Sequence, residues 1–360
     1  MAQFFSRTGR PDTCMTFSVG RSLYRADRIV PVFLPFAGCP RRCVFCAQHQ
    51  QTGQEGDSEA GLREAAMRIT ASPSGRSLEL AFYGGTFTSL PSRIREEAFR
   101  LYLHGHALGK VQCGRCSTRP DALGADSGFP ALLSLADKGL DLVELGIQTF
   151  DDNALLQSRR GYDADTAVQA CLTVRSAGLH LGIQLLPGMP GVTPEVFLKD
   201  VDQALALSPA CLRFYPCLVP AGTVLADMWK EGRYRPWTEE ETVRTLGEGL
   251  RRAWTAGVPV IRLSVAPEAS FEAVLLAGPR HPALGSLIQA EALLRATENA
   301  LRHLNAPLEQ LHLPRSCQGY MYGQHGVLRP RWAAMGLPPE RIFFTDQEYA
   351  VLYSLQQHST

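Results

Sequence analysis

Short runs of apolar and β-branched residues recur along the first two thirds of the chain, with helix-compatible segments between them. The six runs cover residues 30–36, 78–83, 110–116, 141–147, 179–186 and 211–218. The intervening segments, such as 92–103 and 163–177, carry apolar residues at helical spacing. Strands that alternate with helices indicate βα units, right-handed crossovers and a parallel sheet. We therefore expect an α/β fold, a partial (β/α)6 TIM-like barrel.

The pattern changes towards both ends of the chain. Residues 1–28 predict an irregular N-terminal extension, and residues 29–257 predict the barrel. From residue 258 the chain continues with VPVIRLSV, a loop rich in Gly and Pro, a helix over 286–304 and short pieces. Residues 258–360 are therefore expected to form a small C-terminal appendage.

Composition limits the choice of partners. Lys and Arg number 36 against 35 Asp and Glu, so the net charge of +1 commits the protein neither to nucleic acid nor to a membrane. No stretch approaches the roughly 18 apolar residues of a membrane span, and no apolar run follows the N-terminal charges. We expect a cytoplasmic protein with no membrane partner.

Three of the ten cysteines lie within eight residues, a spacing typical of metal or cluster ligation rather than of disulfides. The run IVPVFLPF leads directly into AGCPRRCVFC, so Cys39, Cys43 and Cys46 follow the first predicted strand. Loops at the carboxyl ends of parallel strands are where active sites are built. Thiolates bind iron-sulfur clusters or zinc, and three ligands without a nearby fourth leave one metal position open. The alternative is a zinc knuckle completed by His49 or by Cys113 and Cys116.

Polar residues at the ends of later strands are further candidates. Gly84 and Gly85 end the second run, where the lack of a Cβ lets backbone approach a ligand. Alternation places Glu144, Gly146 and Gln148 on one face of a barrel strand. Buried polar groups are costly unless paired, so Glu144 pairs with an Arg from a neighbouring strand or these residues meet a ligand. The cysteines expected to be core are Cys14, Cys113, Cys116, Cys171, Cys211 and Cys217.

Seven segments in order resemble the radical domain of the Elongator catalytic subunit family, within the radical S-adenosylmethionine (SAM) superfamily. They are PFAGCPRRCVFCAQHQQTG, FYGGTF, STRPDAL, VELGIQTFDDNAL, RRGYDADTAVQA, LLPGMPG and RFYPCLVPAGTVLADMWKEGRYRPWTEEETV. The resemblance spans residues 30–265. The chain is more distantly similar to the oxygen-independent coproporphyrinogen oxidases.

The resemblance implies a cofactor and a chemistry. Cys39, Cys43 and Cys46 would bind three irons of a 4Fe-4S cluster, and the methionine part of SAM would chelate the fourth. The reduced cluster would cleave SAM to a 5′-deoxyadenosyl radical that abstracts hydrogen from a substrate. A one-electron reductant of the ferredoxin or flavodoxin type is the implied partner.

The same resemblance implies which residues contact SAM. Gly84, Gly85 and Thr86 correspond to the backbone that meets the methionine amino group, and Arg160 to the carboxylate contact. Gln148 and Gln184 correspond to ribose contacts. Ser117 corresponds to a further polar contact, and Phe45 to the aromatic residue before the last cysteine.

The substrate is less constrained. Elongator subunits act on wobble uridines of transfer RNA and add an acetyltransferase domain, but residues 258–360 show no glycine-rich loop for coenzyme A. We expect a radical SAM enzyme without acetyltransferase activity, with an RNA base as the first candidate substrate. Arg41 and Arg42 either meet phosphate or are solvated. The rival hypothesis is a zinc-stabilised RNA-binding module without catalysis.

The tail segment SCQGYMYGQH also carries reactive side chains. Its candidates are Cys317, Tyr320, Tyr322 and His325. They either contribute to a substrate site or, as is commoner for a lone cysteine near tyrosines, pack as core.

Overall fold

The computed structural model describes residues 14–20, 23, 25–34, 37–39, 43–47, 58–124, 128–265, 269–304 and 307–354. The chain divides into two compact units. The barrel unit comprises Leu23–Trp237 and Val265–Pro279, and the terminal unit comprises Met1–Ser22, Thr238–Ser264 and Arg280–Thr360. Within the described ranges, no helix is long and apolar enough to cross a bilayer.

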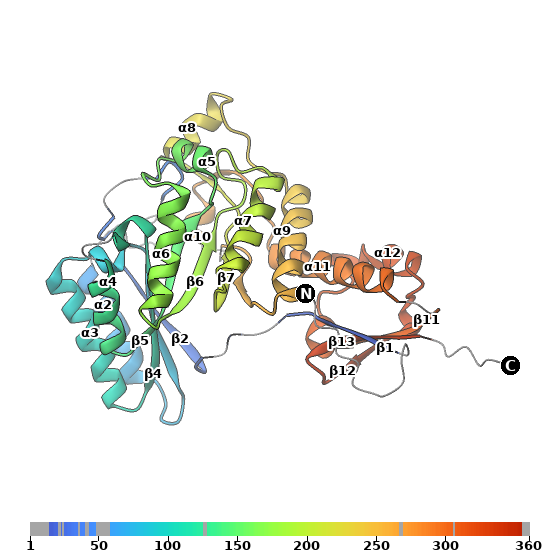
Figure 1. Ribbon diagram of the computed structural model, residues 1–360, viewed down its shortest axis with the longest axis horizontal. Coiled ribbons are helices and arrows are strands. Elements are labelled where there is room, and N and C mark those ends of the chain that lie inside the picture. Colours follow the sequence, from blue (N-terminus) through green and yellow to red (C-terminus); the bar gives the residue numbers. More distant parts are fainter. Residues whose placement is uncertain are drawn as a thin grey trace. The chain divides into compact units, whose positions relative to one another are not determined.

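The central sheet has seven strands, and the six that belong to the barrel unit are parallel and follow one another in sequence order (Figure 1). They are β2 (Arg28–Phe33), β3 (Leu78–Tyr83), β4 (Val111–Thr118), β5 (Leu140–Gln148), β6 (His180–Leu185) and β7 (Cys211–Phe214). The sheet curls into a partial barrel, which confirms the predicted fold class. Each strand lies within a few residues of its predicted run. β7 ends early because Pro216 has no N–H for the ladder.

Helices cover the outer face of this sheet. They are α2 (Ser58–Ala71), α3 (Ser92–Ala107), α4 (Gly128–Asp137), α6 (Ala164–Ser176) and α7 (Pro194–Ala206). α6 shows why these segments are helical. The Asp163 side chain caps the first turn of α6 by accepting a hydrogen bond from Thr166 N (2.9 Å), and residues at helical spacing along the helix are buried. That buried face contacts β5 and β6.

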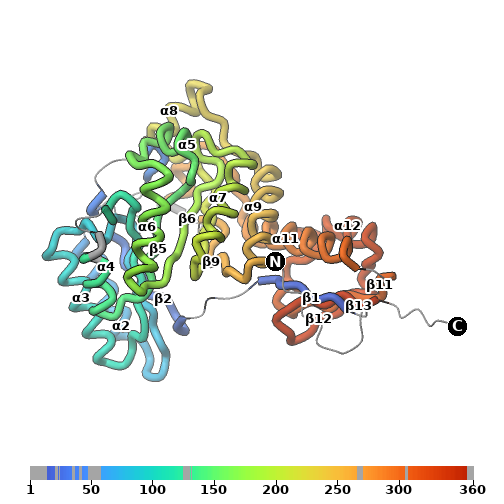
Figure 2. The backbone as a smooth tube through the Cα atoms, viewed as in Figure 1, coloured from blue at the N-terminus to red at the C-terminus, as the bar shows by residue number. Residues whose placement is uncertain are grey.

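Shorter elements complete the barrel unit. They are α5 (Asp152–Gln157), β8 (Val219–Pro220), α8 (Val224–Lys230), α10 (Ala269–Glu272) and β10 (Leu275–Ala277). β8 pairs with β10 in an antiparallel ribbon. α5 and α8 lie at the same end of the barrel unit in both backbone views (Figures 1 and 2).

Charged residues inside the barrel pair with one another. Glu144 on β5 accepts hydrogen bonds at Oε1 from Arg115 on β4 and Arg213 on β7, both at 3.0 Å. Arg115 also forms a two-point ion pair with Glu79 on β3, and Arg25 lies 3.1 Å from Glu79. The structure therefore confirms the pairing of Glu144 with arginines from other strands.

The terminal unit is built from distant parts of the sequence. Its sheet has the order β1 (Cys14–Ser18), β13 (Tyr349–Ser354), β11 (Leu308–Pro314) and β12 (Ile342–Thr345). Its other elements are α9 (Glu239–Thr255), β9 (Val260–Arg262), α11 (Leu284–Arg302) and α12 (Arg329–Ala334). The prediction of irregular structure before residue 29 is wrong for residues 14–18. Among the described residues β1 pairs with β13 alone, which is distant in the sequence, so no neighbouring sequence signals the strand.

Candidate functional site

The cysteine loop after β2 is anchored by backbone hydrogen bonds at the buried residue Val44. Val44 N donates to Ser158 O at the end of α5 (3.3 Å), and Val44 O accepts from Leu225 N in the first turn of α8 (2.9 Å). These bonds tie the segment between Cys43 and Cys46 to two other segments of the barrel unit. The loop therefore lies at the carboxyl end of the strands, as predicted.

The turn after β3 passes very close to the chain that leads into Cys39. Thr86 N donates to Ala37 O (2.8 Å), and a Cβ on Gly85 would lie 2.2 Å from the same oxygen. Only glycine permits this approach. The buried Thr86 hydroxyl lies 3.2 Å from Cys39 Sγ. Thr86, predicted as a SAM contact, therefore contacts the first cysteine of the motif.

Two buried arginines contact the second cysteine. Arg160 Nη1 lies 3.0 Å from Cys43 Sγ, and Arg119 Nη1 lies 3.5 Å from it. Arg160 also donates to Tyr162 Oη and Gly146 O. Burial opposes the charge on Arg160, but the neighbouring Tyr162 and Cys43 raise its pKa above the usual value, so the guanidinium stays charged. It forms no ion pair with a carboxylate within the described part of the chain.

Gln148, at the end of β5, has an unusual backbone and an unsatisfied side chain. The β5–β6 register shifts between Leu145 and Gln148, and the Gln148 φ is +74°, in the left-handed region. Its Oε1 is buried without a hydrogen-bond partner among the described residues. Its Nε2 lies 3.2 Å from the position that a Cβ on Gly146 would occupy, and Arg160 Nη2 lies 3.8 Å from the same position. The side chains of Gln148 and Arg160 thus converge over Gly146.

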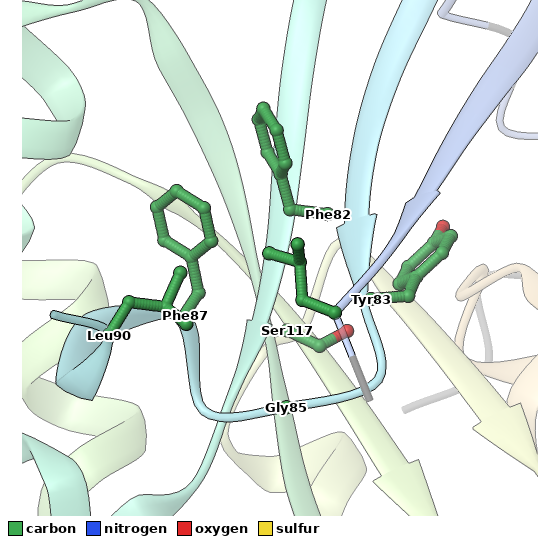
Figure 3. A pocket seen from close by; sticks show the side chains of 7 residues that line it. Phe82, Tyr83, Gly85, Phe87, Leu90 and Ser117 are labelled. Carbon is green, nitrogen blue, oxygen red and sulfur yellow. The ribbon is translucent and has the colours of Figure 1, made fainter. Parts of the chain in front are cut away.

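Ser117 and Gly85 line a small pocket with an empty volume of about 140 Å³ (Figure 3). Its other lining residues are Leu34, Phe82, Tyr83, Phe87 and Leu90. The 140 Å³ includes space open to solvent, and the pocket has no room for even a water-sized sphere. The pocket by itself is therefore too small for a nucleoside-sized cosubstrate, although it adjoins the turn after β3.

Three other predicted residues lie in the anchored loop and on β6. Phe45 and Cys46 are half-buried in the anchored loop, and Gln184 is half-buried on β6. In the ranges that the structure describes, no three His, Cys, Asp or Glu side chains gather closely enough to hold a metal ion. The thiols of Cys39 and Cys43 instead contact Thr86 and Arg160.

The alternative zinc ligands and the tail residues lie in other surroundings. Burial raises the pKa of Cys113 to about 11 and also raises the pKa of Cys116, so both thiols are protonated in the core of β4, as expected of core cysteines. His49, Arg41 and Arg42 lie outside the described residues. Cys317 is buried and accepts a hydrogen bond from Tyr320 Oη (3.2 Å), which is consistent with core packing.

The described residues fit a thiolate-bound cluster and a polar cosubstrate on three counts. All ten cysteines are free of disulfides. The Arg160 cation at Cys43 has no carboxylate counter-ion among the described side chains, and a buried cation of this kind favours an anionic partner. The Gln148 carboxamide carries an unused buried acceptor in a strained turn, a feature that clusters at ligand sites.

Arg119 and Ser158 were missed by the sequence reasoning. Arg119 stands in the STRPDAL segment, where a cation directly after a barrel strand was an available signal. Ser158 carries no such signal, because its role comes from the hydrogen bond that its backbone carbonyl oxygen accepts from Val44 N.

Comparison with known proteins gives two family matches. The Radical SAM superfamily model matches residues 33–204, and the Radical_SAM C-terminal domain model matches residues 209–294. Together they cover the barrel strands from β3 to β7, the cysteine loop and every residue named above as a SAM contact.

Curated relatives and one solved structure are similar to parts of the chain. The tRNA uridine(34) acetyltransferase of Methanocaldococcus jannaschii is 26% identical over 61% of this chain and 47% of its own. The Dehalococcoides mccartyi protein of the same name is 29% identical over 55% of this chain and 50% of its own. The chain thus spans about half the length of these relatives. The archaeal Methanocaldococcus infernus Elp3 structure matches 73% of this chain and 62% of its own with a TM-score of 0.56 at 20% identity, which shows a shared fold.

Proposed function

Since the chain belongs to the radical SAM superfamily, we propose that Cys39, Cys43 and Cys46 hold its 4Fe-4S cluster and that the chain cleaves SAM reductively. The cluster and SAM are the cofactors of this superfamily. When bound, they supply one electron to the sulfonium and a deoxyadenosyl radical that abstracts hydrogen from a substrate. The observation that carries the proposal is the charged, buried Arg160 at Cys43 Sγ, because it offers an anion-binding centre beside a free thiol at the end of a barrel.

Each remaining residue is assigned by the chemistry that it presents. Arg160 would bind the SAM carboxylate, for which a guanidinium fork is suited. The unpartnered Gln148 Oε1 would accept a hydrogen bond from a ribose hydroxyl. The backbone at Gly84 and Gly85 after β3 would meet the methionine amino group, and Thr86 would orient Cys39. Ser117, Phe45 and Gln184 are proposed as further contacts to the cosubstrate.

The partners follow from this chemistry. Reductive cleavage needs a one-electron donor, for which a ferredoxin or flavodoxin is proposed. An RNA base is proposed as the substrate, supported by relatives whose names specify a tRNA uridine. Acetyl transfer is not assigned, because the resemblance to those relatives covers only about half of their length.

Anaerobic reconstitution tests the cofactor assignment. We expect iron and sulfide near four per chain and formation of 5′-deoxyadenosine when dithionite and SAM are added. Cys39→Ala should abolish both. Cys14→Ala, a substitution on β1 outside the motif, should abolish neither. One tightly bound zinc per chain with no adenosine product would instead support the RNA-binding module.

A separate experiment tests the substrate. The reconstituted protein is incubated anaerobically with SAM, dithionite and either total transfer RNA or a small-metabolite extract. A mass change in a nucleoside, coupled to 5′-deoxyadenosine formation, supports the RNA proposal. A change confined to the metabolite extract would contradict it.

A further inference from the structure

Arg119 places a second positive charge beside Cys43 and is held there by its own network. Its side chain is buried, and Nη1 lies 3.5 Å from Cys43 Sγ. The rest of the guanidinium is fixed, because Nε and Nη2 each donate to Asp121 at 2.8 Å and Nη2 donates to Arg160 O at 2.5 Å. The distance to the sulfur is therefore set by the scaffold rather than by a freely rotating side chain.

The charges around Cys43 do not balance. Arg119 and Arg160 contribute two cations, and Asp121 is the one carboxylate paired with either among the described residues. Both guanidiniums also face the ring of Tyr162, with their Cζ atoms 5.6 and 5.1 Å from its centroid. Cys43 thus lies in buried surroundings of net positive charge, where electrostatic interactions are stronger than in water.

We infer that Arg119 is a positioning residue that raises the reduction potential of the cluster by holding a fixed positive charge at Cys43. The inference rests on the proposed function. Reduction by one electron adds one negative charge to the cluster, and a nearby buried cation favours that reduced form. Charge and hydrogen bonds near the cysteine sulfurs are among the factors that set such potentials. The negative charge of Asp121 lowers the reduction potential of the cluster, although the same carboxylate orients the Arg119 guanidinium.

The test is a redox titration of the reconstituted full-length protein with dithionite, followed by electron paramagnetic resonance without SAM. For Arg119→Gln we expect the midpoint potential of the cluster to fall. At the wild-type midpoint, the ratio of reduced to oxidised cluster should fall at least tenfold, and a tenfold change corresponds to a shift of 59 mV for one electron. Arg119→Lys should shift the midpoint less, because it keeps the charge. Asp121→Asn should shift the midpoint upwards. Opposite shifts would not arise from general loosening of the fold.

Arg159→Gln is the matched control, because Arg159 is exposed and adjacent in sequence to Arg160. Its midpoint should equal that of the wild type. An unchanged midpoint in Arg119→Gln, or shifts of the same sign in Arg119→Gln and Asp121→Asn, would overturn the inference while leaving the cluster assignment intact. Should Arg119→Gln fail to load a cluster, Arg119→Lys and Asp121→Asn decide by the same criterion. A wild-type protein without iron and sulfide would overturn the proposed function itself.

Discussion

Replacing Glu144 by Gln tests whether the charge network inside the barrel supports the fold. The Glu144 carboxylate is 3% exposed, and it neutralises Arg115 and Arg213, which are 2% and 9% exposed. The network holds three arginines against the buried carboxylates of Glu79 and Glu144 and the half-exposed carboxylate of Asp141, which pairs with Arg25. The substitution would leave the buried Arg213 cation without a carboxylate partner among the described residues and would leave Arg115 paired with Glu79 alone.

Breaking a buried ion pair by removing one partner costs about 3–5 kcal/mol. That loss is large against a total stability of about 5–15 kcal/mol. We therefore expect Glu144→Gln to lower the midpoint of urea unfolding strongly, as followed by circular dichroism. Glu64→Gln is the control, because Glu64 pairs with Arg68 at the surface, with exposures of 43% and 47%. It should cost less than about 1 kcal/mol. Equal losses in the two variants would refute the argument that burial makes the network important.

Three further predictions concern single residues. Burial raises the pKa of Asp200 to about 7, against hydrogen bonds from Phe150 N and Thr149 that lower it, so the folded state binds this proton more tightly than the unfolded chain. The free energy of unfolding should therefore fall as the pH rises from about 4 to 7, and the fall between about pH 5 and 8 should be on the order of 2–3 kcal/mol. The urea midpoint of Asp200→Asn should lack this pH dependence. Gly85→Ala should destabilise the protein by about 1–3 kcal/mol and reduce iron uptake, because its Cβ would overlap Ala37 O. Gly124→Ala, with φ −58° and no atom within 4 Å, should be neutral, and a neutral Gly85→Ala would refute the close-approach argument. Gln148→Gly should relieve the strain of φ +74° and raise the unfolding free energy by about 1 kcal/mol, yet weaken SAM binding in calorimetry. Undiminished SAM binding would contradict the ligand role of Gln148.

Much of the barrel could be predicted because the signals are local. The β3 run predicted at 78–83 is the observed strand, and α6 lies within its predicted segment, because apolar spacing and an Asp cap act over a few residues. The position of Cys39, Cys43 and Cys46 after the first barrel strand could also be predicted, since strand and motif are contiguous. The pairing of β1 with β13 could not, because those strands are more than 300 residues apart.

The sequence by itself determined the fold class, the location of the cysteine loop and the identity of most polar residues at the strand ends. Only the tertiary structure decided what those residues contact: Thr86 at Cys39, and Arg119 with Arg160 at Cys43. It also decided the register shift that accompanies the left-handed backbone of Gln148. The physical reason is that hydrogen bonds and charge compensation depend on which segments the folded chain brings within a few ångströms, and spacing along the sequence does not encode those distances.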